Sequence, residues 1–323
     1  MPSSPTSATP SRVSPTDLAL LVYLGAVWGA AFLFFRVASP EIGPLWTAEI
    51  RVAIAGLVLA FVSGRSALAA ARRQPAAFLI VGATFSAIPF SLLAFATLSL
   101  PASLASLLMA TTPLFTAIVS AAWLRQRLAP SVVAGLGLGF GAVVFLLGGS
   151  PIDIGPATVV AVAAGLGAAL SYAFAGTFVR RRLGDVAPLD LATGQLVAAA
   201  VILLPISLLS GIPPAPSPAA AGSLVTMGVV STAIAWPVYF RILSRTTATA
   251  ASSSTFLVPM FGIVWGGLIL GEHVGPELLA GFGLVIVSLV LVLRLPVPRP
   301  AALRVSVGRL VARSTAAIGA VLG

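Results

Sequence analysis

Two charged residues stand inside a long apolar stretch of this sequence. Arg51 and Glu49 lie within residues 44–63, a run long enough to form a helix that crosses a membrane. An arginine at the centre of such a helix costs about 2.5–3.5 kcal/mol, so we expect Arg51 to face protein or water and to have a partner. Residues two apart lie on different helix faces, so Glu49 need not be that partner. Arg51 is expected either to contact an anionic group of a ligand or to fix helix packing.

Two prolines occupy equivalent places near the middle of two other apolar runs. Pro113 and Pro259 each remove a backbone hydrogen bond and kink the helix that contains them. The freed carbonyls must be satisfied by neighbours such as Thr112, Ser254 and Thr255, or by water in a cavity. We therefore expect a bent, polar wall around a cavity halfway through the membrane, and a packing kink away from any cavity is the alternative.

Four aromatic residues with a polar atom lie within apolar runs, away from the ends where an interfacial belt would form, although Tyr239 is near the cytoplasmic end of its run. They are expected either to line the cavity or to pack in the core, because ligand sites are largely apolar. Gln195 takes the place of Arg51 in a second copy of this part of the sequence, so a role of Arg51 would be asymmetric. The four aromatic residues are Trp28, Tyr172, Trp236 and Tyr239.

Other chemistry finds little support in the sequence. The single histidine, His273, stands beside Glu272, and the chain has no cysteine, so too few ligands are present to predict a metal site. The glycine-rich run 135–141 lies inside an apolar stretch with no lysine, which argues against a phosphate-binding loop. No Ser/His/Asp set and no clustered carboxylates occur at membrane depth. We therefore predict neither a catalytic site nor a cofactor.

The composition predicts a membrane protein. Of 323 residues, 59% are hydrophobic and only 8% are charged, and the mean hydropathy is +1.09. A soluble domain carries about 25% charged residues. The net charge of +10 comes from arginines in short clusters between apolar runs, with no basic domain to hold a nucleic-acid strand. A lipid bilayer is the expected partner, and nucleic acid is not.

Apolar runs of about 20 residues predict helices that cross the bilayer. The expected fold is an all-α integral membrane protein with ten transmembrane helices. The predicted spans, numbered 1 to 10 in chain order, are 17–36, 44–63, 76–98, 101–123, 131–149, 157–179, 188–210, 218–241, 248–270 and 276–294.

The arginines predict the orientation. With a cytoplasmic N-terminus, every inside segment carries arginine, whereas the outside loops hold only Arg36. The outside loops instead carry acidic residues, namely Glu41, Asp153, Glu272 and Glu277. Both termini are then cytoplasmic. Residues 1–15 are expected to be a disordered cytoplasmic tail, and residues 296–323 a basic cytoplasmic tail that lies on anionic lipid or stays disordered.

The sequence contains an internal repeat. An offset of 146 residues places Pro113 on Pro259 and the run 134–138 on 280–284, and an offset of 144 places Arg51 on Gln195. The repeats are expected at 16–150 and 156–295. Because each holds five spans, the second enters the membrane in the opposite sense to the first, as in many transporters.

These features resemble the EamA-type members of the drug/metabolite transporter superfamily. The resemblance rests on the duplicated five-helix unit, Trp28 followed by glycine, Arg51 in span 2, the two central prolines, and Gly271 with Glu272 after span 9. It implies ten helices, cytoplasmic termini and export or exchange of small metabolites such as amino acids. One departure is Gln126, where the family usually has an acidic residue after span 4.

The sequence therefore predicts a secondary transporter of small, amino-acid-like metabolites in the cytoplasmic membrane, working by alternating access. Its cavity would be lined by spans 1, 3, 4, 6, 8 and 9. A lipid or polyprenyl-carrier flippase on the same scaffold is the alternative, and a polytopic membrane enzyme is a weaker one. A homodimer could form through spans 5 and 10, which have few polar residues. With Glu49 the chief titratable group within the spans, the sequence alone does not support proton coupling.

Overall fold

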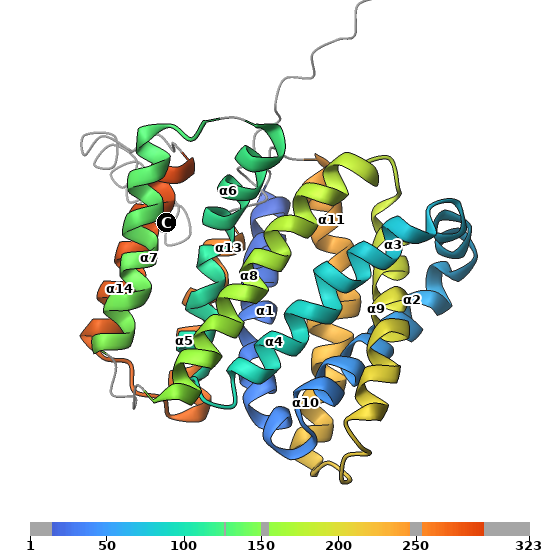
Figure 1. Cartoon of the computed structure of the whole chain (residues 1–323). Helices are drawn as coiled ribbons and strands as arrows, with labels where there is room; N and C mark the ends of the chain where they lie inside the picture. Colours follow the sequence, from blue (N-terminus) through green and yellow to red (C-terminus); the bar gives the residue numbers. More distant parts are fainter. Residues whose placement is uncertain (1–14, 126, 150–154, 246–253, 294–323) are drawn as a thin grey trace, which may run out of the picture.

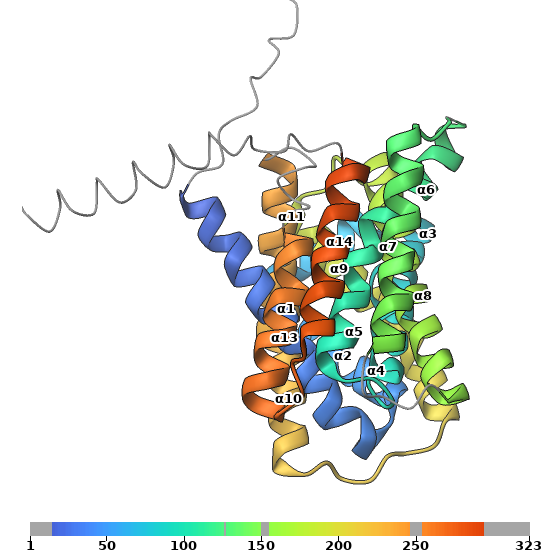
Figure 2. The ribbon, with the colours of Figure 1, turned by 90° about the vertical axis from the view of Figure 1, so that its left-hand side faces the viewer.

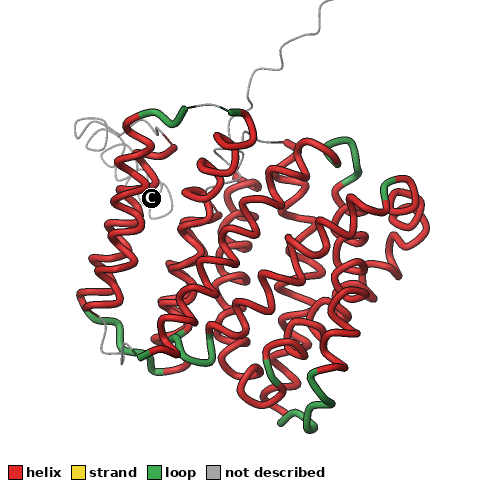
Figure 3. Tube along the Cα trace, in the orientation of Figure 1, coloured by secondary structure: helices red, strands yellow, loops and turns green. Residues whose placement is uncertain are grey.

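The computed structural model describes residues 15–125, 127–149, 155–245 and 254–293, and within these ranges every regular element is a helix (Figure 3). The expected all-helical class is confirmed. The predicted tails, residues 1–15 and 296–323, lie outside the described residues except for Pro15, the first residue of α1.

The first half contains α1 (Pro15–Ile42), α2 (Pro44–Arg73), α3 (Pro75–Gly82), η1 (Ala83–Ala87), α4 (Ile88–Ala96), α5 (Ala102–Leu108), η2 (Met109–Thr111), α6 (Thr112–Leu124) and α7 (Pro130–Gly149). The second half contains α8 (Pro156–Arg182), α9 (Pro188–Leu209), α10 (Pro218–Gly228), η3 (Val229–Ile234), α11 (Ala235–Arg245), α13 (Ser254–Leu270) and α14 (Pro276–Leu293).

Proline sets where most of these helices begin. At the first helical position a proline loses nothing, because the N–H that it lacks would have no partner within the helix, and its fixed φ already suits the helix. This explains why the predicted starts agree closely with the structure. The prolines that begin helices are Pro15, Pro44, Pro75, Pro130, Pro156, Pro188, Pro218 and Pro276.

Eight helical stretches of the described chain are long and apolar enough to cross a membrane. They coincide with predicted spans 1 to 8, although the second, Pro44–Arg73, runs ten residues beyond its predicted end. Two shorter apolar helices, Leu257–Leu270 and Pro276–Val292, coincide with predicted spans 9 and 10. The structure thus describes a multi-pass bundle with eight such spans and two further apolar helices.

Three of the predicted spans are not continuous α-helices. Spans 3 and 8 each contain a wide π-helical turn, η1 and η3, and span 4 contains the 3-10 turn η2 just before Pro113. At η2 the carbonyl of Met109 would lose its usual donor at Pro113, and it accepts from the backbone N–H of Thr112 instead. The backbone N–H of Thr112 therefore satisfies the carbonyl that Pro113 leaves free, where we expected hydroxyl groups or water.

Helices from the two halves pack against each other along the bundle (Figures 1 and 2). α2 lies against α9, α1 against α13, and α7 against α14. Close approach depends on glycine: a Cβ added at Gly135 would lie 2.7 Å from Val292 Cγ2 and 2.9 Å from the Ser288 carbonyl oxygen. Gly137 and Gly141 form a Gly-x-x-x-Gly motif, a pattern that permits close approach of helices. Nothing lies within 4 Å of a Cβ added at either glycine, so this motif contacts no described helix.

Candidate functional site

A cluster of six aromatic rings joins four elements in the interior of the bundle. Phe85 brings it together, because its ring centroid lies 4.8 Å from that of Trp236, 5.7 Å from Tyr172 and 5.9 Å from Phe240. Trp28 lies 5.5 Å from Trp236. All four predicted aromatic site residues are therefore members. The aromatic cluster consists of Trp28 (α1), Phe85 (η1), Tyr172 (α8), and Trp236, Tyr239 and Phe240 (α11).

Arg51 is buried beside this cluster without an acidic partner. Its side chain is 3% exposed, and its Nε donates to Thr232 Oγ1 at 2.8 Å. The guanidinium carbon lies 3.8 Å from the ring centroid of Phe90 and 5.1 Å from that of Phe35. Within the described residues no carboxylate comes within 4 Å of it, since the one ion pair there joins His273 to Glu277. Aromatic faces and one hydroxyl thus hold a positive charge whose remaining donors are free for another acceptor.

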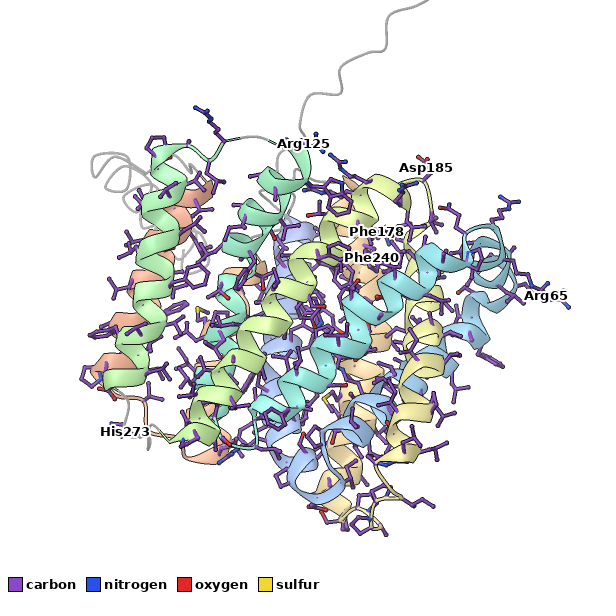
Figure 4. All side chains as sticks on the ribbon, viewed as in Figure 1. Arg65, Arg125, Phe178, Asp185, Phe240 and His273 are labelled. Carbon is purple, nitrogen blue, oxygen red and sulfur yellow. The ribbon has the colours of Figure 1, made fainter. Side chains whose placement is uncertain are left out.

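The turn η3 connects Arg51 to the aromatic cluster. Thr232 accepts from Arg51, and the adjacent Ser231 carbonyl accepts from Trp28 Nε1 at 3.1 Å. Elements of both halves therefore meet at this place, with α1, η1 and α4 from the first and α8, η3 and α11 from the second. Phe240 of the aromatic cluster is labelled in Figure 4, above the middle of the bundle.

Gln195 occupies the place that corresponds to Arg51 in the second half. Ser86 Oγ donates to Gln195 Oε1 at 3.4 Å, just as Arg51 is bonded to Thr232, and an offset of 146 relates Ser86 to Thr232. Gln195 is fully buried, and its Nε2 has no hydrogen-bond partner among the described residues. The structure therefore places Gln195 in a second polar pair, not in the aromatic cluster itself.

Both polar pairs depend on a glycine that precedes a π-helical turn. A Cβ added at Gly82 would lie 2.8 Å from the Gln195 carbonyl oxygen, and one at Gly228 would lie 2.7 Å from Ile54 Cγ2. These glycines let η1 and η3 approach α9 and α2 closely. The widened turn also frees backbone acceptors, because Thr232 Oγ1 donates to the Met227 carbonyl five residues earlier. Such turns inside α-helices are frequent at functional sites.

Three predicted site residues with described side chains, Thr112, Pro113 and Pro259, are not part of the cluster. Pro113 is buried at the start of α6, and the Thr112 carbonyl accepts from Thr116 Oγ1 at 2.8 Å. Pro259 is buried within α13, which packs on α1. The backbones of Ser254 and Thr255 begin α13, and their side chains lie outside the described part of the structure. None of the described three makes a hydrogen bond or ring contact with the aromatic cluster.

Several contributing residues were missed from the sequence. Phe85, Phe90 and Phe240 have no polar atom, so nothing distinguished them from core residues. Ser86 and Thr232 could have been found, because they are hydroxyl residues at equivalent positions of the repeat. A search for polar residues that recur at the repeat offset would have singled out both.

Glu272 also has a role that was not predicted. Its carboxylate accepts from the backbone N–H groups of Ala102 and Ser103, at 2.6 and 2.9 Å, and from Ser103 Oγ at 2.6 Å. The residue after span 9 thus caps the helix that begins span 4, where a negative charge is stabilised by the helix dipole. Neighbouring His273 is exposed and lies at the end of the bundle opposite Arg125 (Figure 4).

The long apolar helices define a multi-pass integral membrane protein. The chain belongs to the EamA-like transporter family, whose model matches residues 17–148 and 159–294, one match in each half. It is 29% identical over 281 residues to the "Uncharacterized transporter YvbV" of Bacillus subtilis (strain 168), covering 84% of this chain and 90% of that protein. It is 28% identical to the "Probable terminal-alkyne amino-acid exporter" of Streptantibioticus cattleyicolor, covering 85% and 92%.

A further relative is an "Uncharacterized transporter" of Archaeoglobus fulgidus, 25% identical over 83% of this chain and 95% of that protein. One solved structure, described as "Crystal structure of protein", superposes with a TM-score of 0.61 at 19% identity, covering 86% of this chain and 96% of that one. That likeness concerns the fold alone. The family and these relatives are named as transporters, so the chain is a membrane transporter and not an enzyme.

Proposed function

We propose that this protein is a secondary transporter that exports or exchanges small, amino-acid-like metabolites across the cytoplasmic membrane. It would do so by alternating access, with ten spans arranged as two inverted five-helix repeats at 16–150 and 156–295. Both termini would be cytoplasmic. The arginine distribution supports this orientation, and the antiparallel contacts of α2 with α9 support the inversion: Ser63 Oγ lies 2.7 Å from Thr193 Oγ1, and Trp46 Nε1 donates to the Gly211 carbonyl at 2.7 Å.

One observation carries the proposed substrate site: Arg51 is a buried cation without a carboxylate partner, at the meeting place of both halves and beside the aromatic cluster. A ligand with a carboxylate and an apolar body would satisfy both features, because Arg favours planar oxyanions and the rings offer apolar surface. The resemblance to an amino-acid exporter agrees with this chemistry. Gln195, Thr112, Pro113, Ser254, Thr255 and Pro259 would line other parts of the pathway.

Apolar side chains exposed around the bundle would face the lipid bilayer. Phe61, which is 95% exposed, is an example, and so are Val144 and Leu279 on α7 and α14. A homodimer through α7 and α14 remains a prediction that single-molecule photobleaching in nanodiscs would test.

Transport by the purified protein in liposomes tests the proposal. The internal solution would contain an unlabelled amino-acid mixture, and uptake of each labelled amino acid in turn would be measured by counterflow. We expect wild type to accumulate at least one of them and Arg51→Gln to lose this accumulation. No accumulation across the full panel, or movement of a fluorescent phospholipid in its place, would contradict the proposal and favour a lipid flippase.

A further inference from the structure

Glu49 is a second buried charge-bearing residue, and the proposed substrate site does not use it. It is 5% exposed, and its Oε2 is closed off from solvent without a hydrogen-bond partner among the described residues. No arginine nitrogen of the described chain lies within 4 Å of its carboxylate. A buried carboxylate that stays charged without a partner is highly unfavourable, whereas a protonated one is neutral and can donate a hydrogen bond.

The packing of α2 on α9 shows what lies opposite Glu49. Glu49, Gly56 and Ser63 are seven residues apart, close to two turns each, so they share one stripe of α2. That stripe faces α9, because Ser63 Oγ lies 2.7 Å from Thr193 Oγ1 and a Cβ added at Gly56 would lie 3.5 Å from the Val197 nitrogen. Because the two helices run antiparallel, residues nearer the start of α2 contact residues nearer the end of α9. At the far end of this interface, Trp46 donates to the Gly211 carbonyl.

Glu49 therefore lies at the level of Ser207, between the contacts of Gly56 and Trp46. Ser207 is fully buried, and its Oγ also has no hydrogen-bond partner among the described residues. A buried hydroxyl and a buried carboxylate, both unsatisfied, thus face the same interface.

The internal repeat gives this pair a counterpart. The offset of 144 residues that relates Ser63 to Ser207 also relates Glu49 to Thr193. The bonded pair of Ser63 and Thr193 near one end of the α2–α9 interface therefore corresponds to Ser207 and Glu49 near the other. Thr193, whose hydroxyl keeps its proton, therefore corresponds to Glu49, whose carboxylate can bind or release one.

Other charges on the elements around α2 are held elsewhere. On α9, Asp190 accepts from Ser66 at 2.6 Å near the opposite end of the interface. On α1, Arg36 donates to the Thr97 and Leu98 carbonyls, and Glu41 accepts from Ser217. The elements α3, η1, α4, α10 and η3, which also pack against α2, contain no titratable residue. The remaining titratable residues on α1 and α2 are Asp17, Tyr23, Arg51, Arg65, Arg72 and Arg73.

We propose that Glu49 is a proton-binding site whose occupancy couples transport to a proton gradient. Ser207 faces the same interface but is not bonded to Glu49 in this arrangement. In the step itself, a proton from hydronium adds to the carboxylate, which gives a neutral carboxylic acid and one water molecule. The neutral acid suits the closed interface described here. The charged carboxylate needs water, so loss of the proton favours an arrangement in which this end of the α2–α9 interface opens.

A proton is a better occupant than a metal cation. Sodium or a divalent ion would need several oxygen ligands, and among the described residues no group of three His, Cys, Asp or Glu side chains comes together. A single carboxylate suffices for a proton. The coupling to transport rests on the proposed function, whereas proton binding by Glu49 does not.

Infrared difference spectroscopy tests proton binding directly on the full-length protein in detergent. We expect wild type at about pH 6, above the usual titration of glutamate near 4.3, to show the carbonyl band of a protonated carboxylic acid. The band should disappear in Glu49→Gln and in Glu49→Thr, and it should persist in Glu277→Gln, which alters a carboxylate at the end of the bundle. Glu49→Thr reproduces the hydroxyl pair of the other half, so it should fold even if Glu49→Gln does not.

Absence of the band from wild type at this pH, or its survival in both Glu49 variants, would overturn the proposal. Coupling is then tested in liposomes with labelled L-phenylalanine and an imposed pH gradient. We expect the gradient to change the flux through wild type and to leave any flux through Glu49→Thr unchanged. If the gradient changes both fluxes equally, or neither, Glu49 does not couple transport. If no amino acid moves at all, the proposed function fails while the infrared result still decides whether Glu49 binds a proton.

Discussion

Replacement of Arg51 by glutamine separates a binding role from a structural one. The substitution removes the bond to Thr232 and the contact with the Phe90 ring. A hydrogen bond to a charged group contributes about 1.5–3 kcal/mol and a desolvated cation–π contact about 2 kcal/mol. Against these stands the cost of burying the arginine in the membrane, about 2.5–3.5 kcal/mol.

The opposing contributions nearly cancel, so Arg51→Gln should change the free energy of unfolding by only about 1 kcal/mol. Binding of a carboxylate should respond much more. Loss of one partner from a buried charge pair costs about 2–5 kcal/mol, so affinity should fall at least about 30-fold. A purely structural arginine would show the opposite: reduced stability and an unchanged affinity of the folded fraction.

The assay is a thermal-shift titration of the detergent-purified protein with L-phenylalanine and with its amide, which has no carboxylate. Wild type should be stabilised by the acid and much less by the amide, and Arg51→Gln should respond weakly to both. Arg36→Gln is the matched control, because Arg36 bonds backbone carbonyls near the end of α1 and lies outside the aromatic cluster. Equal stabilisation of wild type and Arg51→Gln by a ligand that binds would refute the reasoning.

Three further predictions concern the scaffold. Glu272→Ala should lower the free energy of unfolding by about 1–3 kcal/mol because α5 loses a charged cap, and exposed His273→Ala should not; chemical denaturation of both in detergent checks this, and equal effects would count against the cap. Gly135→Ala should cost about 1–3 kcal/mol by overpacking α7 against α14, whereas Gly137→Ala should be silent in the same assay. Single cysteines at Gln74 and His273 should react with an impermeant maleimide from opposite sides of the membrane; reaction from the same side would exclude the proposed orientation.

The helical framework was predictable from the sequence because its signals are strong and local. Apolar runs of membrane length gave the spans, and prolines such as Pro44 and Pro188 marked their starts. The π-helical turns η1 and η3 were not predictable, because their residues have no composition that separates them from an α-helix. They arise from packing: Gly82 and Gly228 allow close approach to a neighbouring helix that only the fold supplies.

The candidate site was predictable only where a residue stood out from its surroundings. Arg51 and the Trp and Tyr residues were singled out because a polar atom within an apolar membrane span is costly unless it has a partner. Phe85 and Phe90 are ordinary residues of a membrane helix, and only their positions around Trp236 and Arg51 give them a role. Pro113 was expected at the cavity because prolines break helices, but its break is satisfied locally by Thr112.

Labelling of one engineered cysteine tests most directly whether a central site opens to both sides in turn. The chain has no native cysteine, and Ser171 stands next to Tyr172 on α8, where its Oγ donates to the Thr84 carbonyl of η1 at 2.7 Å. Ser171→Cys in sealed vesicles of each orientation should react with an impermeant maleimide from either side, and a transported amino acid should slow both reactions. Reaction from one side alone, or from neither, would contradict alternating access at this site.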